Sequence, residues 1–117
     1  MVKRLVAMAI AALWMAQASA EAQFGVTVYP GAKADAAVTR DLKEKLKVNG
    51  FAYRTADGVA KVADFYRKQP PLKELPGASK ESAAFGHGPV MVTIQNPWMD
   101  MSTGKMNGDT LISIVKN

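Results

Sequence analysis

The sequence predicts an α+β fold, with one helix over about residues 57–69 packed on a mostly antiparallel sheet of three to five strands. It also allows a second helix over about 35–48. Two observations predict this fold class. First, one segment carries apolar residues at the spacing of a helix face, while apolar residues in the neighbouring segments alternate at the two-residue period of strands. Second, strand-like runs follow one another in the C-terminal half with turn residues between them, as in antiparallel hairpins. A helix between runs of strands is typical of α+β domains.

The first 20 residues have the three regions of a secretory signal peptide. A basic start is followed by an uninterrupted apolar run, Leu5 to Ala16, and then by small residues at Ala18 and Ala20. A transmembrane anchor is one alternative, but it needs about 20 apolar residues; a buried N-terminal helix is the other. We therefore expect cleavage after Ala20, a single domain over 21–117, a periplasmic or secreted location, and no stable membrane anchor after cleavage.

Composition narrows the classes of function. The chain contains no cysteine, so an exported domain has no disulfides and its hydrophobic core alone has to stabilise the fold. The formal net charge is +5, and the lysines of segment 43–47 stand close to Asp41 and Glu44. Mixed charge of this kind is typical of a solvated face rather than of a nucleic-acid footprint, so we expect no nucleic-acid partner.

The first strand of the domain is expected just after its N-terminus. Phe24, Val26 and Val28 alternate and should share one face of a strand. Pro30-Gly31 then predicts a turn.

The segment 35–48 has only a narrow apolar stripe. Val38, Leu42 and Leu46 are four residues apart, as on one side of a helix, and Asn49-Gly50 offers a helix stop. An extended, charged connection is the alternative, and the sequence leaves that choice open.

The helix over 57–69 has the clearest pattern in the chain. Asp57 is placed to accept hydrogen bonds from the free amides of the first turn. Pro70-Pro71 ends the helix, because proline lacks the amide hydrogen that the next turn needs. The apolar positions repeat at helical spacing: Val59, Val62, Ala63 and Tyr66.

Apolar residues alternate along the remaining expected strands in the same way as along the first. A short strand over 82–85 and a turn over 86–89 are expected ahead of the last two strands, which the connection over 98–109 joins as a long hairpin. A connection of this length is commonly functional or disordered. In chain order, the residues that share a strand face are Phe51, Tyr53 and Thr55; then Val90, Val92 and Ile94; then Ile112 and Ile114, with Leu111 and Val115 on the opposite face.

Three short stretches of the chain resemble a group of small exported bacterial proteins and lipoprotein domains. The stretches are Val28-Tyr29-Pro30-Gly31-Ala32, Tyr53-Arg54-Thr55-Ala56-Asp57 and Val62-Ala63-Asp64-Phe65-Tyr66-Arg67. The pattern of the group is a YPGA turn, a Y-x-T-x-D strand and a helix with V-x-x-F-Y. The resemblance implies an exported location and this order of elements. No activity is assigned to the group, so the resemblance implies no catalytic residue.

The sequence lacks the residue patterns that enzyme catalysis needs. His87, the only histidine, lies between glycines in an expected turn, whereas a nucleophilic triad needs a base oriented by a third group. The acidic residues are scattered, as at Asp57, Asp100 and Asp109, whereas acid–base catalysis needs two carboxyls in one cleft. Gly86-x-Gly88 precedes a strand, not the helix that a phosphate loop requires. We therefore expect no enzyme and no catalytic residue.

The connection between the last two strands gathers Trp98, Met99, Met101 and Met106. Thioether sulfur is a soft ligand that selects copper(I), and Met99 and Met101 would point the same way in an extended strand. With His87, these methionines predict a copper(I) or silver(I) site as one hypothesis. The combination is similar to periplasmic copper(I) chaperones that carry a His, a Trp and an M-x-M pair on a small barrel. Here, however, Trp98 directly precedes the first methionine, and the strand order does not indicate a barrel.

Two other interpretations of this connection need no metal. In the first, Trp98 closes over the end of the sheet while Met91 and Met99 complete the core. In the second, Trp98, Met99, Met101 and Met106 form a partner-binding surface, because Trp and Met are enriched at the centres of interfaces. We expect a non-enzymatic binding or accessory module without a cofactor. Its interaction surface would be the Trp98–Met106 connection, and its partner a protein or small ligand of the periplasm.

Overall fold

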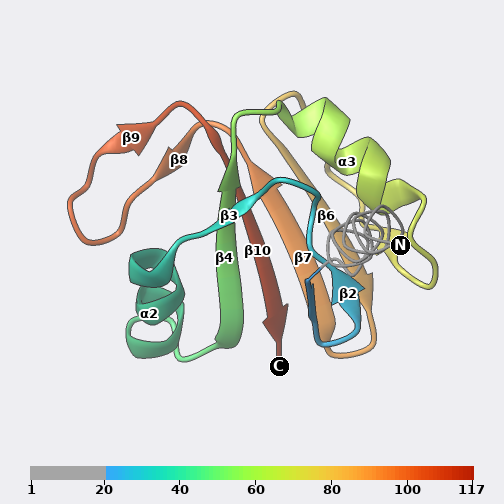
Figure 1. Ribbon diagram of the computed structural model, residues 1–117, viewed down its shortest axis with the longest axis horizontal. Helices are drawn as coiled ribbons and strands as arrows, with labels where there is room; N and C mark the ends of the chain where they lie inside the picture. The colour runs from blue at the N-terminus through green and yellow to red at the C-terminus, as the bar shows by residue number, and fades with distance from the viewer. Residues whose placement is uncertain (1–20) are drawn as a thin grey trace, which may run out of the picture.

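The computed structural model describes residues 21–117 (Figure 1), and the signal peptide predicted over 1–20 lies outside them. One antiparallel sheet of six strands dominates the described part. In sheet order its strands are β3 (Lys33–Ala34), β4 (Asn49–Thr55), β10 (Thr110–Lys116), β7 (Val90–Gln95), β6 (Ser82–His87) and β5 (Lys73–Glu74). Two small ribbons, β1 (Ala22–Gln23) with β2 (Val26–Thr27) and β8 (Trp98–Met99) with β9 (Met106–Asn107), and two helices, α2 (Ala36–Glu44) and α3 (Val59–Arg67), complete it.

The α+β class is confirmed, but the sheet has more strands than the expected three to five. The two additional strands, β3 and β5, are edge strands of two residues each. Segments this short carry no detectable alternation, so the sequence pattern does not show them. The final hairpin is confirmed, because β7 and β10 pair as antiparallel neighbours on either side of the 98–109 connection.

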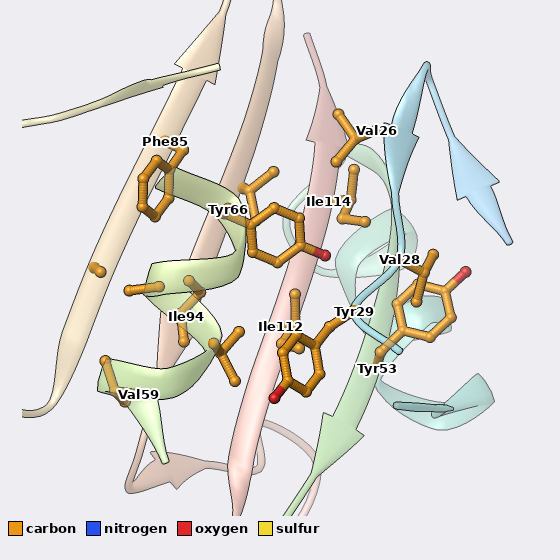
Figure 2. Close-up of a cluster of buried hydrophobic side chains, with 14 of the residues drawn as sticks. Val26, Val28, Tyr29, Tyr53, Val59, Tyr66, Phe85, Ile94, Ile112 and Ile114 are labelled. Atoms are coloured by element: carbon orange, nitrogen blue, oxygen red, sulfur yellow. The ribbon is translucent and has the colours of Figure 1, made fainter. Parts of the chain in front are cut away.

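The larger core lies between α3 and one face of the sheet. Ile112 and Ile114 of β10 point into it, as their alternation predicts, and Tyr66 of α3 is fully buried against them. Figure 2 shows these side chains converging with Val26 of β2 between the helix and the strands. The predicted apolar stripe of α3 is confirmed, since its four members are all buried.

A smaller core covers the opposite face of the sheet. Ala52 of β4 and Leu111 of β10 alternate with the residues that face the larger core, so they point to this face. They are buried there together with Val38, Leu42 and Trp98. The segment over 35–48 is therefore partly helical: α2 occupies 36–44 and packs its two apolar residues on this face. In Figure 1 the two helices lie at opposite ends of the sheet.

The structure corrects two expectations around α2. The helix ends at Glu44, so Leu46 lies beyond it and is 53 % exposed. Asn49-Gly50 does not stop the helix, because both residues belong to β4. The reversal comes earlier, where Lys47 adopts a positive φ of 59° and the amide of Val48 bonds to the carbonyl of Leu42 at 3.0 Å.

Two further expectations fail at helix and strand ends. Phe24 does not share a strand face with Val26, because Phe24 and Gly25 form the two-residue turn between β1 and β2, both with positive φ as a type I′ turn requires. Asp57 does not cap α3: the N-cap is Gly58, which makes no side-chain cap bond. The carboxylate of Asp57 is turned toward Tyr29 instead.

Within residues 21–117, no helix is both long enough and apolar enough to cross a membrane.

Candidate functional site

The connection after β7 is a structured ribbon, which we call the methionine hairpin (residues 98–107). Trp98 pairs with Asn107 and Met99 pairs with Met106 across its two strands. A tight turn closes it: the amide of Asp100 bonds to the carbonyl of Lys105 at 2.9 Å, and that of Gly104 to the carbonyl of Asp100 at 2.7 Å. In Figure 1 this hairpin extends away from the main sheet.

Trp98 fixes the base of the hairpin to the domain. Its side chain is only 3 % exposed and belongs to the smaller core. Its indole Nε1 donates to Oδ1 of Asp109 at 2.9 Å, and the guanidinium carbon of Arg54 lies 5.0 Å from the centre of its ring. The packing interpretation is therefore correct for Trp98, which presents no surface to a partner.

The methionines of the hairpin face the other way. Met99 is 57 % exposed, Met106 60 % and Met101 38 %, so the packing interpretation is wrong for Met99. Met91, in contrast, is half-buried in β7. Met101 lies in the turn, so the expected Met99–Met101 alignment does not form. The close pair is Met99 with Met106, because directly opposed residues on a ribbon share a face with Cβ atoms about 5 Å apart.

The tip of the hairpin rests on the C-terminal part of α2. The hydroxyl of Ser102 donates to Oδ2 of Asp41 at 2.8 Å. Nζ of Lys45 donates to that hydroxyl at 3.2 Å and lies 3.7 Å from Oδ1 of Asp41. Asp41 is consequently buried, although its sequence context predicts a solvated position.

One set of residues therefore defines the candidate site. We call it the exposed apolar patch: Leu46, Met99, Met101 and Met106. These are all the exposed large hydrophobic residues of the described chain, and they lie on the hairpin or directly after the helix end that the hairpin contacts. The sequence pattern points to three of them and misses Leu46, because that residue looks like part of a buried helix stripe.

His87 is not part of this constellation. It is exposed at the end of β6, where it pairs with Val90 at the start of β7. The hairpin begins beyond Gln95, at the other end of β7, which is roughly 17 Å away at the usual rise of a strand. The structure thus separates His87 from the three methionines of the predicted copper set.

A shallow groove of about 640 Å³ gathers acidic residues that look scattered in the sequence. Asp35, Asp57 and Asp109 line it together with Arg54. The guanidinium of Arg54 binds two of the three: its Nε donates to Asp109 at 2.8 Å and its Nη1 to Asp35 at 3.4 Å. The Pro30-Gly31 turn closes one side.

Each of the three carboxylates of this groove has a partner: Asp35 and Asp109 bind Arg54, and Asp57 binds Tyr29. Partial burial acts to raise the pKa of Asp109, but the hydrogen bonds from Arg54 and Trp98 outweigh burial and lower it. A general acid needs a raised pKa, so Asp109 is placed as a structural anion rather than as a proton donor. Within the described residues, no three His, Cys, Asp or Glu side chains are grouped so that they could hold a metal ion.

No model of a protein family, no curated protein and no solved structure matches this chain.

Proposed function

We propose that this protein is an exported, non-enzymatic binding module that binds its partner through the exposed apolar patch. The observation that carries the proposal is that every exposed large hydrophobic residue of the described chain lies on one of two contacting segments, the methionine hairpin and the end of α2. Single exposed apolar residues scattered over a surface are ordinary, whereas a contiguous group of them is typical of an interaction site.

The support beneath the patch suits binding. Trp98 is anchored in the smaller core, and Ser102 ties the hairpin tip to Asp41. The backbone is therefore held while the methionine side chains remain free. Methionine is unbranched and polarizable, so such side chains adapt their shape to an apolar partner at little cost.

The groove around Arg54 supports the non-enzymatic part of the proposal. Its carboxylates are engaged by Arg54 and by Tyr29, so none is left as a free acid–base pair in a cleft. The export signal predicted over 1–20 supports a periplasmic or secreted location.

Site-specific photo-cross-linking tests the proposal. A photoreactive phenylalanine analogue is placed at Met106, and at Ala60 as the control, which is exposed on α3 over the other face of the sheet. In cells that export the protein, we expect a discrete adduct from position 106 and none from position 60. Equal labelling at both positions, or no adduct with either a protein or a lipid at position 106, would remove the basis for assigning the site.

A second candidate function rests on one specific observation, the Met99–Met106 pair. Two thioethers side by side on one ribbon face, with Met101 in the adjoining turn, offer soft ligands to copper(I) or silver(I). Trp98 is the only tryptophan of residues 21–117, so its fluorescence reports on the hairpin. Anaerobic copper(I) titration should quench it saturably at one equivalent.

The matched variants decide this second candidate. Replacing both Met99 and Met106 by Leu keeps the apolar bulk and removes the sulfur, so quenching should disappear. Replacing Met91 by Leu, in β7, should leave the titration unchanged. Quenching that survives the double substitution would exclude the pair as the metal site.

A further inference from the structure

The exposed apolar patch is surrounded by positive charge. The two segments that carry it, 40–47 and 98–107, contain five basic residues (Arg40, Lys43, Lys45, Lys47 and Lys105) and three acidic ones (Asp41, Glu44 and Asp100), a local net charge of +2. Two of the acids are already engaged: Asp41 binds Ser102 and Lys45, and Oδ1 of Asp100 accepts the amides of Ser102 and Thr103 at 2.8 and 3.3 Å.

Three lysines around the patch keep their charge available. Lys43, Lys47 and Lys105 are exposed, and none of them takes part in an ion pair formed within residues 21–117. They lie on the same two segments, 40–47 and 98–107, as the four exposed apolar residues of the patch. A partner that covers the patch therefore has to provide both an apolar layer and negative charge.

A second copy of this chain does not meet that requirement. In a two-fold dimer each patch would face the same patch, so the lysines of one copy would oppose those of the other. Like charges brought together across an interface cost affinity.

The composition of the patch favours a lipid surface over an acidic protein. Protein interfaces are enriched in aromatic residues and methionine but depleted of lysine, whereas the segments of this patch carry three exposed lysines and its one aromatic residue, Trp98, is turned into the core. Segments that lie on membrane surfaces, in contrast, combine apolar side chains with flanking lysines. Anionic headgroups attract such lysines while the apolar side chains reach the acyl boundary.

The shape of the patch fits the same partner. The hairpin projects from the sheet (Figure 1), and none of the five cavities described for residues 21–117 is lined by a patch residue. A projecting surface with flexible apolar tips can enter a soft layer without a preformed groove.

From these observations we infer that the exposed apolar patch docks reversibly on an anionic lipid surface. Met99 and Met106 enter the boundary below the headgroups, and Lys43, Lys47 and Lys105 lie among the phosphates. The inference rests on the proposed function and specifies its partner.

Vesicle co-sedimentation of the protein purified after export tests this inference. Vesicles of phosphatidylglycerol and phosphatidylethanolamine are compared with vesicles of phosphatidylcholine alone. We expect binding to the anionic vesicles only. Since each lysine near an anionic surface accounts for a factor of about five in affinity, Lys43→Gln, Lys47→Gln and Lys105→Gln together should weaken binding about a hundredfold.

Two further variants separate patch-specific docking from general charge attraction. Met99→Gln with Met106→Gln should weaken binding about tenfold, because the apolar side chains no longer enter the layer. The control, Lys68→Gln with Lys73→Gln and Lys80→Gln, removes the same charge from exposed positions just after α3, on β5 and in the loop before β6, and should leave binding unchanged. All of these positions are exposed, and circular dichroism checks that each variant is folded.

Either of two results would overturn the lipid proposal. Equal weakening by the control triple variant would mean adhesion by net charge alone. No binding to anionic vesicles would exclude a lipid partner; a protein adduct from the photoreactive group at position 106 would then keep the proposed function and replace the lipid by an acidic protein. Failure of both experiments would remove both proposals.

Discussion

The hydroxyl of Tyr29 donates a hydrogen bond of 2.6 Å to Oδ2 of Asp57, and this bond joins two segments that are 28 residues apart. It links the turn after β2 to the connection between β4 and α3. The backbone of Asp57 makes two more hydrogen bonds. Its amide donates to Oγ1 of Thr55 at 3.2 Å, and its carbonyl oxygen accepts a hydrogen bond from the hydroxyl of Thr110 at 2.6 Å. The carboxylate is thus committed to a tertiary contact and leaves the first turn of α3 uncapped.

Removal of this bond should destabilise the domain. Tyr29→Phe keeps the buried ring and deletes the donor, so we expect the free energy of unfolding to fall by about 1.5–3 kcal/mol, as for a hydrogen bond to a charged group. Urea unfolding measures the change. In a double-mutant cycle with Asp57→Asn, the two losses should add up to more than the loss in the double variant. Simple additivity would mean that the bond contributes nothing to stability.

The buried tyrosines should make the protein sensitive to alkali. Burial first, and then the hydrogen bond to Asp57 and its charge, raises the pKa of Tyr29 to about 12. Burial, followed by the hydrogen bond to Glu21, raises the pKa of Tyr53 to about 12 as well. In the unfolded chain both lose their protons near pH 10. The stabilisation is therefore fully present below that pH and is lost as pH rises from about 10 to about 12.

The expected loss is up to about 1.4 kcal/mol per pH unit for each tyrosine within that window. Urea unfolding at increasing alkaline pH measures the slope. Tyr53→Phe cannot ionise at this position, so the variant should show a shallower slope than the parent. A parent protein whose free energy of unfolding is constant across the window would contradict the raised pKa values.

Gly50 should tolerate no side chain, although its sequence context indicates a helix stop. A Cβ at this position in β4 would lie 2.6 Å from Cγ1 of Val115 and 2.9 Å from the carbonyl oxygen of Ile114. Gly50→Ala should therefore lower the free energy of unfolding by about 1–3 kcal/mol, as overpacking does. Gly86→Ala is the matched control, because its Cβ would meet only ordinary contacts at 3.7 Å in another strand of the same sheet. Equal effects of the two substitutions would show that the close approach to Val115 is relieved at no cost.

The sequence predicts those parts of the fold that depend on local periodicity. The alternation of β10 separates the residues of the two cores, with Ile112 and Ile114 on one face and Leu111 on the other. The spacing in α3 likewise identifies its buried stripe. Both patterns arise because neighbouring positions on one element face the same environment.

The parts that the sequence does not predict depend on contacts between distant segments. Asp57 has the residue type and position of a helix cap, but Tyr29 is a competing partner that only the fold brings near. Arg54 and Asp109 form an ion pair across 55 residues. Of the candidate site, the methionines are recognisable as unusual, whereas the inward orientation of Trp98 and the exposure of Leu46 depend on tertiary packing.

Trp98 should contribute to stability rather than directly to binding. Trp98→Ala would empty a site in the smaller core and leave Asp109 without its indole donor, so we expect a loss of about 3–5 kcal/mol. Trp98→Phe retains most of the packing and loses the hydrogen bond of 2.9 Å to Asp109, with an expected cost of about 1–2 kcal/mol. Urea unfolding measures both.

The same variants test the separation between the base of the hairpin and its tip. Under conditions in which Trp98→Phe is fully folded, the cross-linking at position 106 should be retained, because the indole does not reach the surface. Met99→Gln should give the opposite result, with stability within about 0.5 kcal/mol of the parent, as for exposed substitutions, and cross-linking reduced. Loss of cross-linking in folded Trp98→Phe would instead place the indole itself in contact with the partner and would contradict its assignment as the buried anchor of the hairpin.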